Sequence, residues 1–335
     1  MVKLMDCTLR DGANVVGTGF SRELTEMMIR GLIKSGITTI EFGNAYGIGA
    51  WETQKNPAPP LNDAEYLDLV QPYLSQAQIG MFAGVKNAVP KNIDLASSRG
   101  LNFLRVGANA GDGASAKDAI PYIKKKGMVC RYSLMKGYIL SAKELAKETA
   151  MLESLGLDEI TIMDSAGTMT PCQVEDYVAE LTAKVKIPVA FHGHNNLGLS
   201  AANALAAFRA GASVLDCGLM GMARSAGNLP TEVAAAIFLR EGERTGVDFY
   251  TLLHFIDDEL APAMEKEGYH NAIMPVDLIY GLAGCHSNFA GLFREAAVRN
   301  KVDLYRLIME VSAIDQKAPS AELIEKIACD MKGGK

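Results

Sequence analysis

Short β-strand patterns alternate with amphipathic helical patterns over roughly the first 240 residues of this 335-residue chain. The predicted strands are Val2–Thr8, Thr38–Phe42, Ile79–Phe82, Phe103–Val106, Met128–Leu134, Glu159–Met163, Pro188–His192 and Ser213–Cys217. Eight strand–helix units place the chain in the α/β class and favour a closed (β/α)8 barrel, the TIM barrel. The alternative is an open doubly wound sheet, but no Gly-x-Gly-x-x-Gly motif follows the first strand.

The predicted helices between the strands carry start and stop signals. They cover Ser21–Ser35, Asp63–Leu74, Ala114–Lys125, Ser141–Ser154, Pro171–Val185, Ser200–Ala210 and Thr231–Arg240. Ser141 with Glu144, and Thr170 with Gln173, have the spacing of capping boxes, which satisfy free amides of a first helical turn. Glycines stand where helices should end, at Gly36, Gly100, Gly127, Gly156 and Gly211.

The alternation stops near residue 245, and only helical patterns follow. They cover Tyr250–Leu260, Asn288–Arg299, Leu304–Val311 and Ser320–Met331. We therefore divide the chain into a catalytic barrel, residues 1–245, and a C-terminal helical extension, residues 246–335. We expect the extension to close the pocket of the barrel and to contribute to an interface.

Charge and hydropathy argue against several classes of protein. The net charge is −6, both signs are interspersed, and the longest basic run is Lys124-Lys125-Lys126, so we expect no nucleic-acid partner. No apolar run approaches the ~18 residues of a membrane span, and we expect no secretory signal. The six cysteines are scattered without a Cys-x-x-Cys pair, which predicts reduced thiols and a cytoplasmic protein.

Polar residues after the strands are the candidates for chemistry, because barrel active sites lie at the carboxyl ends of the strands. Arg10 and Asp11 follow the first strand, where they could equally form a structural ion pair. His192 and His194 end the seventh strand, and its period of two turns both imidazoles to one side. Two imidazoles and a carboxylate make a divalent-metal face with open positions. The alternative is a pair of histidines packed within the strand end.

Two further groups are less specific. Asp164 and Ser165 follow the sixth strand, where Ser165 could bind a substrate carboxylate and Asp164 could orient a metal ligand. A turn into the next helix would explain them equally well. Asn228 follows the eighth strand and is a candidate metal ligand, although capping a helix is the commoner use of asparagine.

As a set, these motifs are specific. They are Asp-x-Thr-Leu-Arg-Asp-Gly at 6–12, Asp-Ser-x-Gly at 164–167, His-x-His-x-Asn-Leu at 192–197 and Gly-Asn-x-Pro at 227–230. The set resembles that of the metallolyase barrels related to hydroxymethylglutaryl-CoA lyase and isopropylmalate synthase. Within this family the 4-hydroxy-2-oxovalerate aldolases are the most similar, and the resemblance covers nearly the whole chain.

The resemblance implies a divalent-metal-dependent aldolase that cleaves or forms a carbon–carbon bond between a pyruvate enolate and an aldehyde. Its substrates would be 4-hydroxy-2-oxo acids. By resemblance, Asp11, His192 and His194 are ligands of Mn2+ or Mg2+, which acts as a Lewis acid. Arg10 is then both catalytic and substrate-binding, because its guanidinium stabilises the enolate oxygen. Ser165 matches a residue close to the pyruvate carboxylate.

The departures from the family pattern concern the proton acceptor. A family histidine two residues after the Asp-Gly pair is here Asn14, which cannot take a proton at neutral pH. His286, in the extension, stands where the family has a tyrosine. We hypothesise that His286 is the catalytic base in place of the missing histidine, because imidazole titrates near neutral pH. The alternative is an ordinary histidine at a helix start.

Other departures concern the aldehyde. Asn44 and Tyr46 replace a family histidine and aspartate after the second strand, and Asn109 replaces a histidine after the fourth. Arg224 replaces a small residue after the eighth strand. We expect Arg224 and Tyr46 to bind substrate, and the aldehyde to be larger than acetaldehyde or anionic. Alternatively, Arg224 is an exposed charge at a helix end.

Two other functions are compatible with the fold. One is a Claisen-type acyl-CoA-dependent synthase of the isopropylmalate synthase type, although we do not expect the long C-terminal regulatory region usual there. The other is a non-catalytic partner barrel. The expected partners are a small-molecule 2-oxo acid and an aldehyde. We also expect a homodimer, or a complex with an aldehyde dehydrogenase.

Overall fold

A closed barrel of eight parallel strands, each paired with the next and β8 with β1, forms the body of the protein. The structure is a computed structural model that describes residues 2–52, 57–269 and 275–333. The strands are β1 (Lys3–Asp6), β2 (Thr39–Phe42), β3 (Gln78–Gly84), β4 (Phe103–Asn109), β5 (Val129–Met135), β6 (Glu159–Asp164), β7 (Val189–Gly193) and β8 (Val214–Cys217). The predicted barrel is therefore confirmed, strand by strand.

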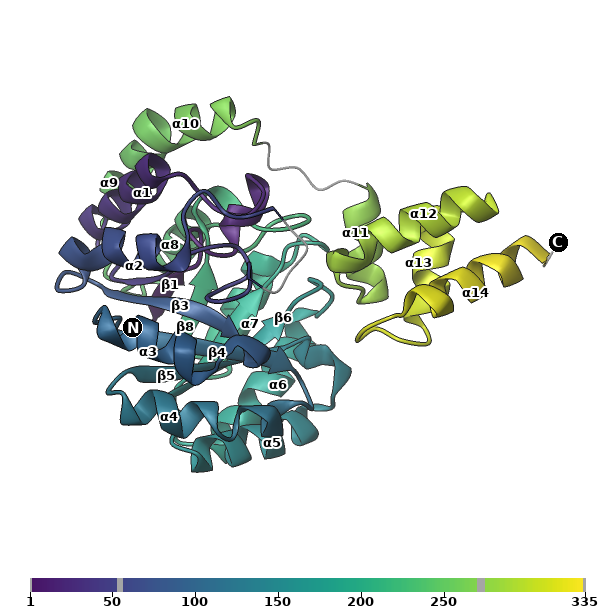
Figure 1. The fold of residues 1–335 in the computed structure, drawn as a ribbon, viewed down its shortest axis with the longest axis horizontal. Helices are drawn as coiled ribbons and strands as arrows, with labels where there is room; N and C mark the ends of the chain where they lie inside the picture. Colours follow the sequence, from purple (N-terminus) through teal and green to yellow (C-terminus); the bar gives the residue numbers. More distant parts are fainter. Residues whose placement is uncertain (1, 53–56, 270–274, 334–335) are drawn as a thin grey trace.

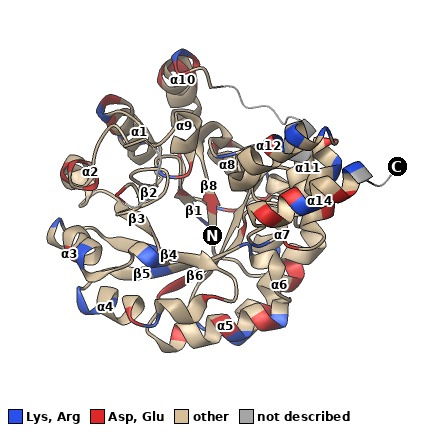
Figure 2. Cartoon of the chain, turned by 45° about the vertical axis from the view of Figure 1, so that its right-hand side comes forward, with Lys and Arg blue, Asp and Glu red and all other residues tan. Residues whose placement is uncertain are grey.

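The helices α1 to α8 surround the strands as a ring (Figures 1 and 2). They are α1 (Arg22–Lys34), α2 (Asp63–Val70), α3 (Pro90–Ser98), α4 (Ala119–Lys125), α5 (Ala142–Ser154), α6 (Pro171–Lys184), α7 (Ser200–Arg209) and α8 (Thr231–Arg240). Both predicted capping boxes are present, at Ser141 and Thr170. The predicted helix over 114–125 is instead split into a 3-10 turn, η4 (Gly113–Ala116), and α4.

The residues after 245 form two groups of helices with different cores. Their elements are α9 (Phe249–Phe255), the π-helical turn η7 (Ile256–Leu260), α10 (Ala261–Lys266), α11 (Pro275–Ala283), η8 (Ser287–Phe289), α12 (Ala290–Asn300), α13 (Leu304–Ser312) and α14 (Ala321–Gly333). The buried apolar residues of α9, η7 and α10 belong to the core of the barrel, where the ring of Phe255 packs on Gly31 of α1. Those of α11 to α14 form a separate core around Phe293 and Leu307, and this bundle stands beside the barrel in Figure 1.

The bundle of α11 to α14 is joined to the barrel by polar contacts near the ends of β4 and β5. The hydroxyl of Tyr138 donates to the carbonyl oxygen of Gly284 at 3.0 Å. The ammonium group of Lys136 donates to the carbonyl oxygen of Lys317, and Nζ of Lys317 lies 3.0 Å from a carboxylate oxygen of Asp112. The first contact holds the segment between α11 and α12 over the carboxyl ends of the strands, and the contacts of Lys317 hold the segment between α13 and α14 there.

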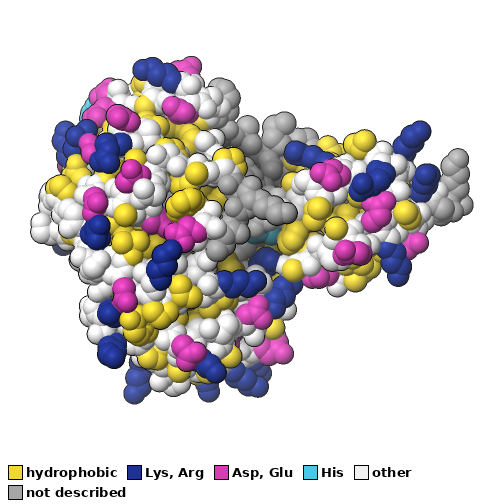
Figure 3. Space-filling view, in the orientation of Figure 1, with side chains coloured by type: hydrophobic (Ala, Val, Ile, Leu, Met, Phe, Trp, Pro, Cys, Tyr) yellow, Lys and Arg dark blue, Asp and Glu magenta, His cyan; other side chains and the backbone are white. Residues whose placement is uncertain are grey.

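The described residues carry mixed surface charge and free thiols. Acidic and basic side chains are interspersed on the face drawn in Figure 3. All six cysteines are free thiols. Among the described residues, no helix has the length and apolarity needed to cross a membrane.

Candidate metal centre and active-site cavity

A cavity of about 180 Å3 opens at the carboxyl ends of the strands. Eight of the nine residues that the sequence predicts to bind metal or substrate, or to act as the base, line this cavity. They are Arg10, Asp11, Tyr46, Ser165, His192, His194, Arg224 and His286. The ninth, Asn228, is not among the lining residues but donates to Asp11. Residues far apart in sequence are therefore brought to one place by the closure of the barrel.

Asp11, His192 and His194 form a buried cluster that could hold a metal ion. Their ligand atoms all lie within 4.8 Å of one another. Oδ2 of Asp11 is 3.5 Å from Nε2 of His192 and 3.7 Å from Nε2 of His194. The turn after β1 fixes Asp11, whose amide donates to the carbonyl oxygen of Cys7 at 2.8 Å. One carboxylate and two imidazoles suit a divalent ion with open positions.

Asn228 adds an independent reason to expect a cation here. Its Nδ2 donates to Oδ2 of Asp11 at 2.8 Å. Its Oδ1 is buried without a hydrogen-bond partner among the described residues. A buried carbonyl oxygen without a donor is costly unless a cation or water satisfies it. Asn228 does not cap α8, because Pro230 occupies the N-cap position.

The protonation states of Asp11 and His194 suit metal binding. Burial raises the pKa of Asp11, but Arg10 and the two histidines outweigh this and hold the pKa well below its usual range. Burial lowers the pKa of His194 to about 4, although Asp11 opposes the change. Burial also lowers the pKa of His192, but hydrogen bonds to Asp11 and Asp216 raise it above the ordinary value overall. An ionised carboxylate beside a neutral His194 is the form that a metal requires.

A network of buried charges inside the barrel supports the cluster. Nδ1 of His192 lies 3.0 Å from Oδ2 of Asp216 on β8. The guanidinium of Arg105 on β4 donates to Asp216 and to Glu41 on β2, and none of these three side chains is accessible to solvent. Glu41 in turn accepts from Nε of Arg10 at 2.6 Å.

This network was not predicted from the sequence. Glu41, Arg105 and Asp216 lie within strands rather than after them, so a search of the strand ends does not find them. The available signal was a single charge flanked by apolar residues in a strand pattern, as in Ile40-Glu41-Phe42 and Leu215-Asp216-Cys217. Such a charge must either face solvent or find a partner inside the barrel.

Arg10 is held rigidly but keeps a free donor. Besides its bond to Glu41, its Nη1 lies 3.0 Å from Oδ1 of Asp11, and its guanidinium lies 5.0 Å from the ring centre of Phe82. Its Nη2 is buried with no hydrogen-bond partner among the described residues. The ion pair with Asp11 is thus present, and a donor remains for a ligand in the cavity.

Asp164 and Ser165 have different surroundings. The carboxylate of Asp164 accepts from the amides of Thr168 at 3.0 Å and Met169 at 2.9 Å, so it builds the turn that leads to α6. Ser165 lines the cavity, and its Oγ accepts from the amide of Lys136 at 2.9 Å. Because this bond uses Oγ as an acceptor, the hydroxyl hydrogen of Ser165 remains available to a ligand.

Arg224 points into the cavity and is not an exposed charge at a helix end. Its Nε donates to Oδ1 of Asn14 at 2.8 Å, and its Nη1 donates to Oδ1 of Asn288 in the extension. Its guanidinium lies 5.0 Å from the ring centre of Tyr46. Asn14 is therefore engaged in positioning Arg224. Asn44 points elsewhere, because its Nδ2 donates to Asp63 and to the carbonyl oxygen of Gly47.

His286 both begins a short helix and faces the cavity. Its Nδ1 accepts from the amide of Asn288 at 3.1 Å at the start of η8. Its ring centre lies 6.5 Å from that of His194. Desolvation lowers the pKa of His286 well below its ordinary value, and the charge of Arg224 acts in the same direction. Because Nδ1 accepts this bond, the neutral imidazole carries its hydrogen on Nε2, which can donate to a ligand in the cavity.

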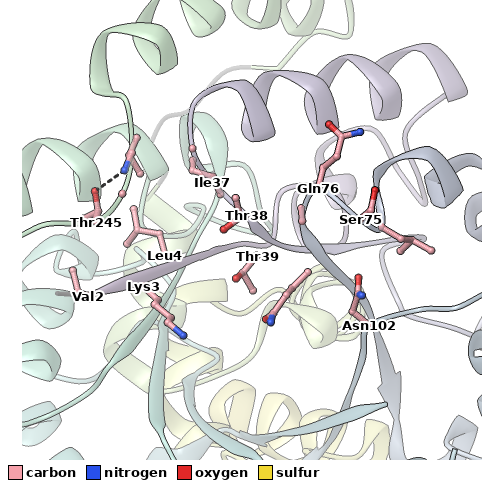
Figure 4. Close-up of a pocket in the computed structure, with 16 residues that line it drawn as sticks. Val2, Lys3, Leu4, Ile37, Thr38, Thr39, Ser75, Gln76, Asn102 and Thr245 are labelled. Carbon is pink, nitrogen blue, oxygen red and sulfur yellow. Dashed lines mark hydrogen bonds between the residues drawn. The ribbon is translucent and has the colours of Figure 1, made fainter. Parts of the chain in front are cut away.

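A larger hollow at the opposite end of the barrel lacks comparable chemistry. It measures about 560 Å3 and lies between the amino ends of the strands and the residues near 245 (Figure 4). Lys3 is the one ionisable side chain among the residues that line it, and the others are apolar residues, glycines, hydroxyls and amides such as Thr38 and Asn102. The metal cluster therefore distinguishes the smaller cavity as the candidate active site.

Comparisons with known proteins identify relatives over the whole chain. The HMGL-like family model matches residues 1–258. A 4-hydroxy-2-oxovalerate aldolase of Carboxydothermus hydrogenoformans is 30% identical, over 98% of this chain and 97% of the relative. A 4-hydroxy-2-oxovalerate aldolase of Desulfitobacterium hafniense is 32% identical, over 92% of each.

Solved structures share the fold at lower identity. The carboxyl transferase domain of Rhizobium etli pyruvate carboxylase, crystallised with pyruvate, superposes with a TM-score of 0.79 at 16% identity, over 99% of this chain and 61% of that one. The HMG-CoA lyase of Bacillus subtilis superposes with a TM-score of 0.65 at 19% identity, over 82% of this chain and 95% of that one.

Proposed function

The chain belongs to the HMGL-like family, and from this premise we propose that it is a metal-dependent aldolase that cleaves 4-hydroxy-2-oxo acids to pyruvate and an aldehyde, or joins the two. Relatives that carry the name 4-hydroxy-2-oxovalerate aldolase match this chain from end to end. The observation that carries the proposal is the metal cluster of Asp11, His192 and His194 beside the free Nη2 of Arg10.

A divalent ion, which we propose to be Mn2+ or Mg2+, would be held by Asp11, His192 and His194. The free Oδ1 of Asn228 is a candidate fourth ligand. Oxygen and imidazole donors in this combination suit either ion better than a soft metal. When bound, the ion supplies Lewis acidity to a 2-oxo acid.

We assign the binding of the pyruvate half to Arg10 and Ser165. The free Nη2 of Arg10 can donate to the oxygen on which negative charge develops when an enolate forms. Glu41 and Asp11 fix the guanidinium in advance, so little reorganisation accompanies this step. The hydroxyl of Ser165 can donate to the carboxylate of pyruvate. Arg224 and Tyr46 lie on the side left for the aldehyde.

We propose that His286 accepts the proton of the 4-hydroxyl group in the cleavage direction. As this O–H bond breaks, the carbonyl of the aldehyde forms and the C3–C4 bond breaks. The electron pair of that bond passes to the pyruvate enolate, whose oxygen faces Arg10, and C3 then takes up a proton. The lowered pKa of His286 keeps its imidazole neutral before the reaction. For Nε2 to take the proton, Nδ1 must give up its bond from the amide of Asn288 and carry the ring hydrogen instead.

We further propose that residues 246–335 extend a catalytic barrel, with α9, η7 and α10 packed into the core of the barrel and the bundle of α11 to α14 completing the cavity. His286 and Asn288 reach the cavity from this extension. The exposed apolar side chains of α12 and α13, such as Val298 and Tyr305, support a role of the extension in an interface. A homodimer and a complex with an aldehyde dehydrogenase are the two assemblies we propose to test.

The function is tested by proton NMR of pyruvate in D2O with metal-free protein, before and after addition of Mn2+ at trace levels or Mg2+. We expect deuterium to enter the methyl group only with metal, and the exchange to be lost in Asp11→Ala. Asp68→Ala, which removes an exposed carboxylate on α2, is the matched control. Absence of exchange with either ion would contradict the proposal, and a requirement for CoA would favour the Claisen-type synthase.

A further inference from the structure

A second cavity adjoins the catalytic one and shares two of its walls. It measures about 660 Å3 and lies over the ends of β3 and β4. Tyr46 and Met135 line both cavities. We propose that this side cavity binds the remote end of the aldehyde, and that the aldehyde is a chain of several carbons with an anionic group at that end. The inference rests on the proposed aldolase function and extends it to the second substrate.

The sizes of the two cavities support a long aldehyde. Sites for small molecules usually measure ~300–1,000 Å3. The catalytic cavity, at about 180 Å3, is below this range, whereas the side cavity is well within it. A two-carbon aldehyde would leave the side cavity filled with water. A longer chain can pass Tyr46 and enter it.

The side cavity has unfilled space next to Gly84. A Cβ atom added to Gly84, at the end of β3, would meet no other atom within 4 Å. At Gly107 on the neighbouring strand, the same atom would lie 2.4 Å from Cζ of Phe82. Gly84 thus leaves space that a side chain could fill, whereas Gly107 permits close packing.

The charges around the two cavities favour an anion. Lys86 lines the side cavity, and no carboxylate among the described residues pairs with it. Arg224, at the junction beside Tyr46, has the amide oxygens of Asn14 and Asn288 as its hydrogen-bond partners among the described residues. The one carboxylate that lines the side cavity, Asp112, is already paired with Lys317.

Neutral groups in the side cavity can bind the chain of the aldehyde. The side-chain amides of Asn87 and Asn109 line it, and neither has a hydrogen-bond partner among the described residues. Each offers one acceptor and two donors. Hydroxyl groups along a substrate chain could therefore be bound by these amides, between the charges of Lys86 and Arg224.

The test compares aldehydes in the addition of pyruvate, by kcat/KM for each aldehyde. One pair is 4-oxobutanoate against butanal, and the other is glyceraldehyde 3-phosphate against glyceraldehyde, so that carboxylate and phosphate are distinguished. We expect the anionic member of at least one pair to be favoured by about 10-fold or more, which is the scale of one charge-assisted contact. Acetaldehyde should be a poorer substrate than the favoured anion.

Two variants locate the effect. Lys86→Met should reduce the preference for the anion at least about 3-fold, whereas Lys117→Met, which removes an exposed lysine outside the cavity, should not. Gly84→Leu should lower kcat/KM for the four-carbon aldehydes relative to kcat/KM for acetaldehyde, because the leucine side chain enters the open space. Equal use of charged and neutral aldehydes, or equal losses for all aldehydes in both variants, would overturn the inference.

Deuteration of pyruvate, measured on the same preparations, separates this inference from the function on which it rests. Metal-dependent deuterium exchange without any preference for an anionic aldehyde supports the proposed aldolase function and rejects the side-cavity proposal. Absence of metal-dependent exchange rejects both.

Discussion

Nδ1 of His192 lies 3.0 Å from Oδ2 of Asp216, while Nε2 of the same ring faces Asp11 at a distance of 3.5 Å. A carboxylate at Nδ1 places the hydrogen there and leaves the lone pair of Nε2 directed toward the metal cluster. Because Asp216 also accepts from Arg105, its own orientation is fixed by a buried cation. The strand interior thus determines which nitrogen of His192 can bind a metal.

The first prediction concerns Asp216 as a positioning residue. Asp216→Asn should lower the affinity for Mn2+ by about 10- to 100-fold, because His192 loses the carboxylate that fixes its tautomer. Free Mn2+ can be titrated by electron paramagnetic resonance, with thermal unfolding as the check on folding. Asp94→Asn, which removes an exposed partner of Lys126, is the control. Unchanged Mn2+ affinity in a folded Asp216→Asn variant would refute the positioning role.

The second prediction concerns the stability contributed by Arg105. Arg105→Met should lower the free energy of unfolding by about 3–5 kcal/mol, because it leaves the carboxylates of Glu41 and Asp216 buried without their shared cation. Urea titration followed by circular dichroism measures the change. Arg99→Met breaks an exposed pair with Asp68 and should lower the free energy by no more than about 1 kcal/mol. Similar values for both variants would contradict the argument.

The third prediction tests His286 as the base. His286→Ala should lower kcat for cleavage of a 4-hydroxy-2-oxo acid by about 100-fold or more, the usual contribution of a general base. The matched control is His254→Ala, because the side chain of His254 is 79% exposed on α9. A loss of no more than a few-fold in His286→Ala would leave this histidine with only its role at the start of η8.

The fourth prediction concerns stability and pH through Asp6. Burial raises the pKa of Asp6 to about 6, although Thr8 and Thr231 oppose the change. The folded protein therefore favours the protonated carboxyl. This contribution to stability is complete below the unfolded pKa of about 4 and is lost as pH rises through 6. Relative to Asp6→Asn, the wild type should lose about 2–3 kcal/mol between pH 4 and pH 8, measured by urea unfolding at each pH. A constant difference would contradict the raised pKa.

The architecture could be predicted because it depends on repeated local patterns. Each strand is an apolar run bounded by turn residues, and eight such runs leave few arrangements. The helix α3 was missed, because Val89 at its N-cap offers no capping side chain and the helix is only 9 residues long. The helices α10 and α11 were also missed; α10 has 6 residues and directly continues the π-helical turn η7.

Part of the candidate site could also be predicted from local patterns, and part depends on contacts between distant segments. Arg10, Asp11, His192 and His194 follow strands, so the barrel geometry alone brings them together. Whether Arg224 points inward depends on Asn14 and on Asn288 in the extension, and no local pattern encodes such contacts. The side cavity depends on the packing of loops after β3 and β4 and has no sequence pattern of its own.

The separate core of α11 to α14 has an evolutionary consequence. The residues proposed to activate pyruvate are anchored in one hydrophobic core, whereas His286 is carried by a bundle that is stabilised by another. Mutations that repack the bundle can therefore exchange or reposition the proton acceptor while the metal ligands remain untouched. Selection can diversify the aldehyde half of such an enzyme independently of the pyruvate half, as two modules inherited in one chain.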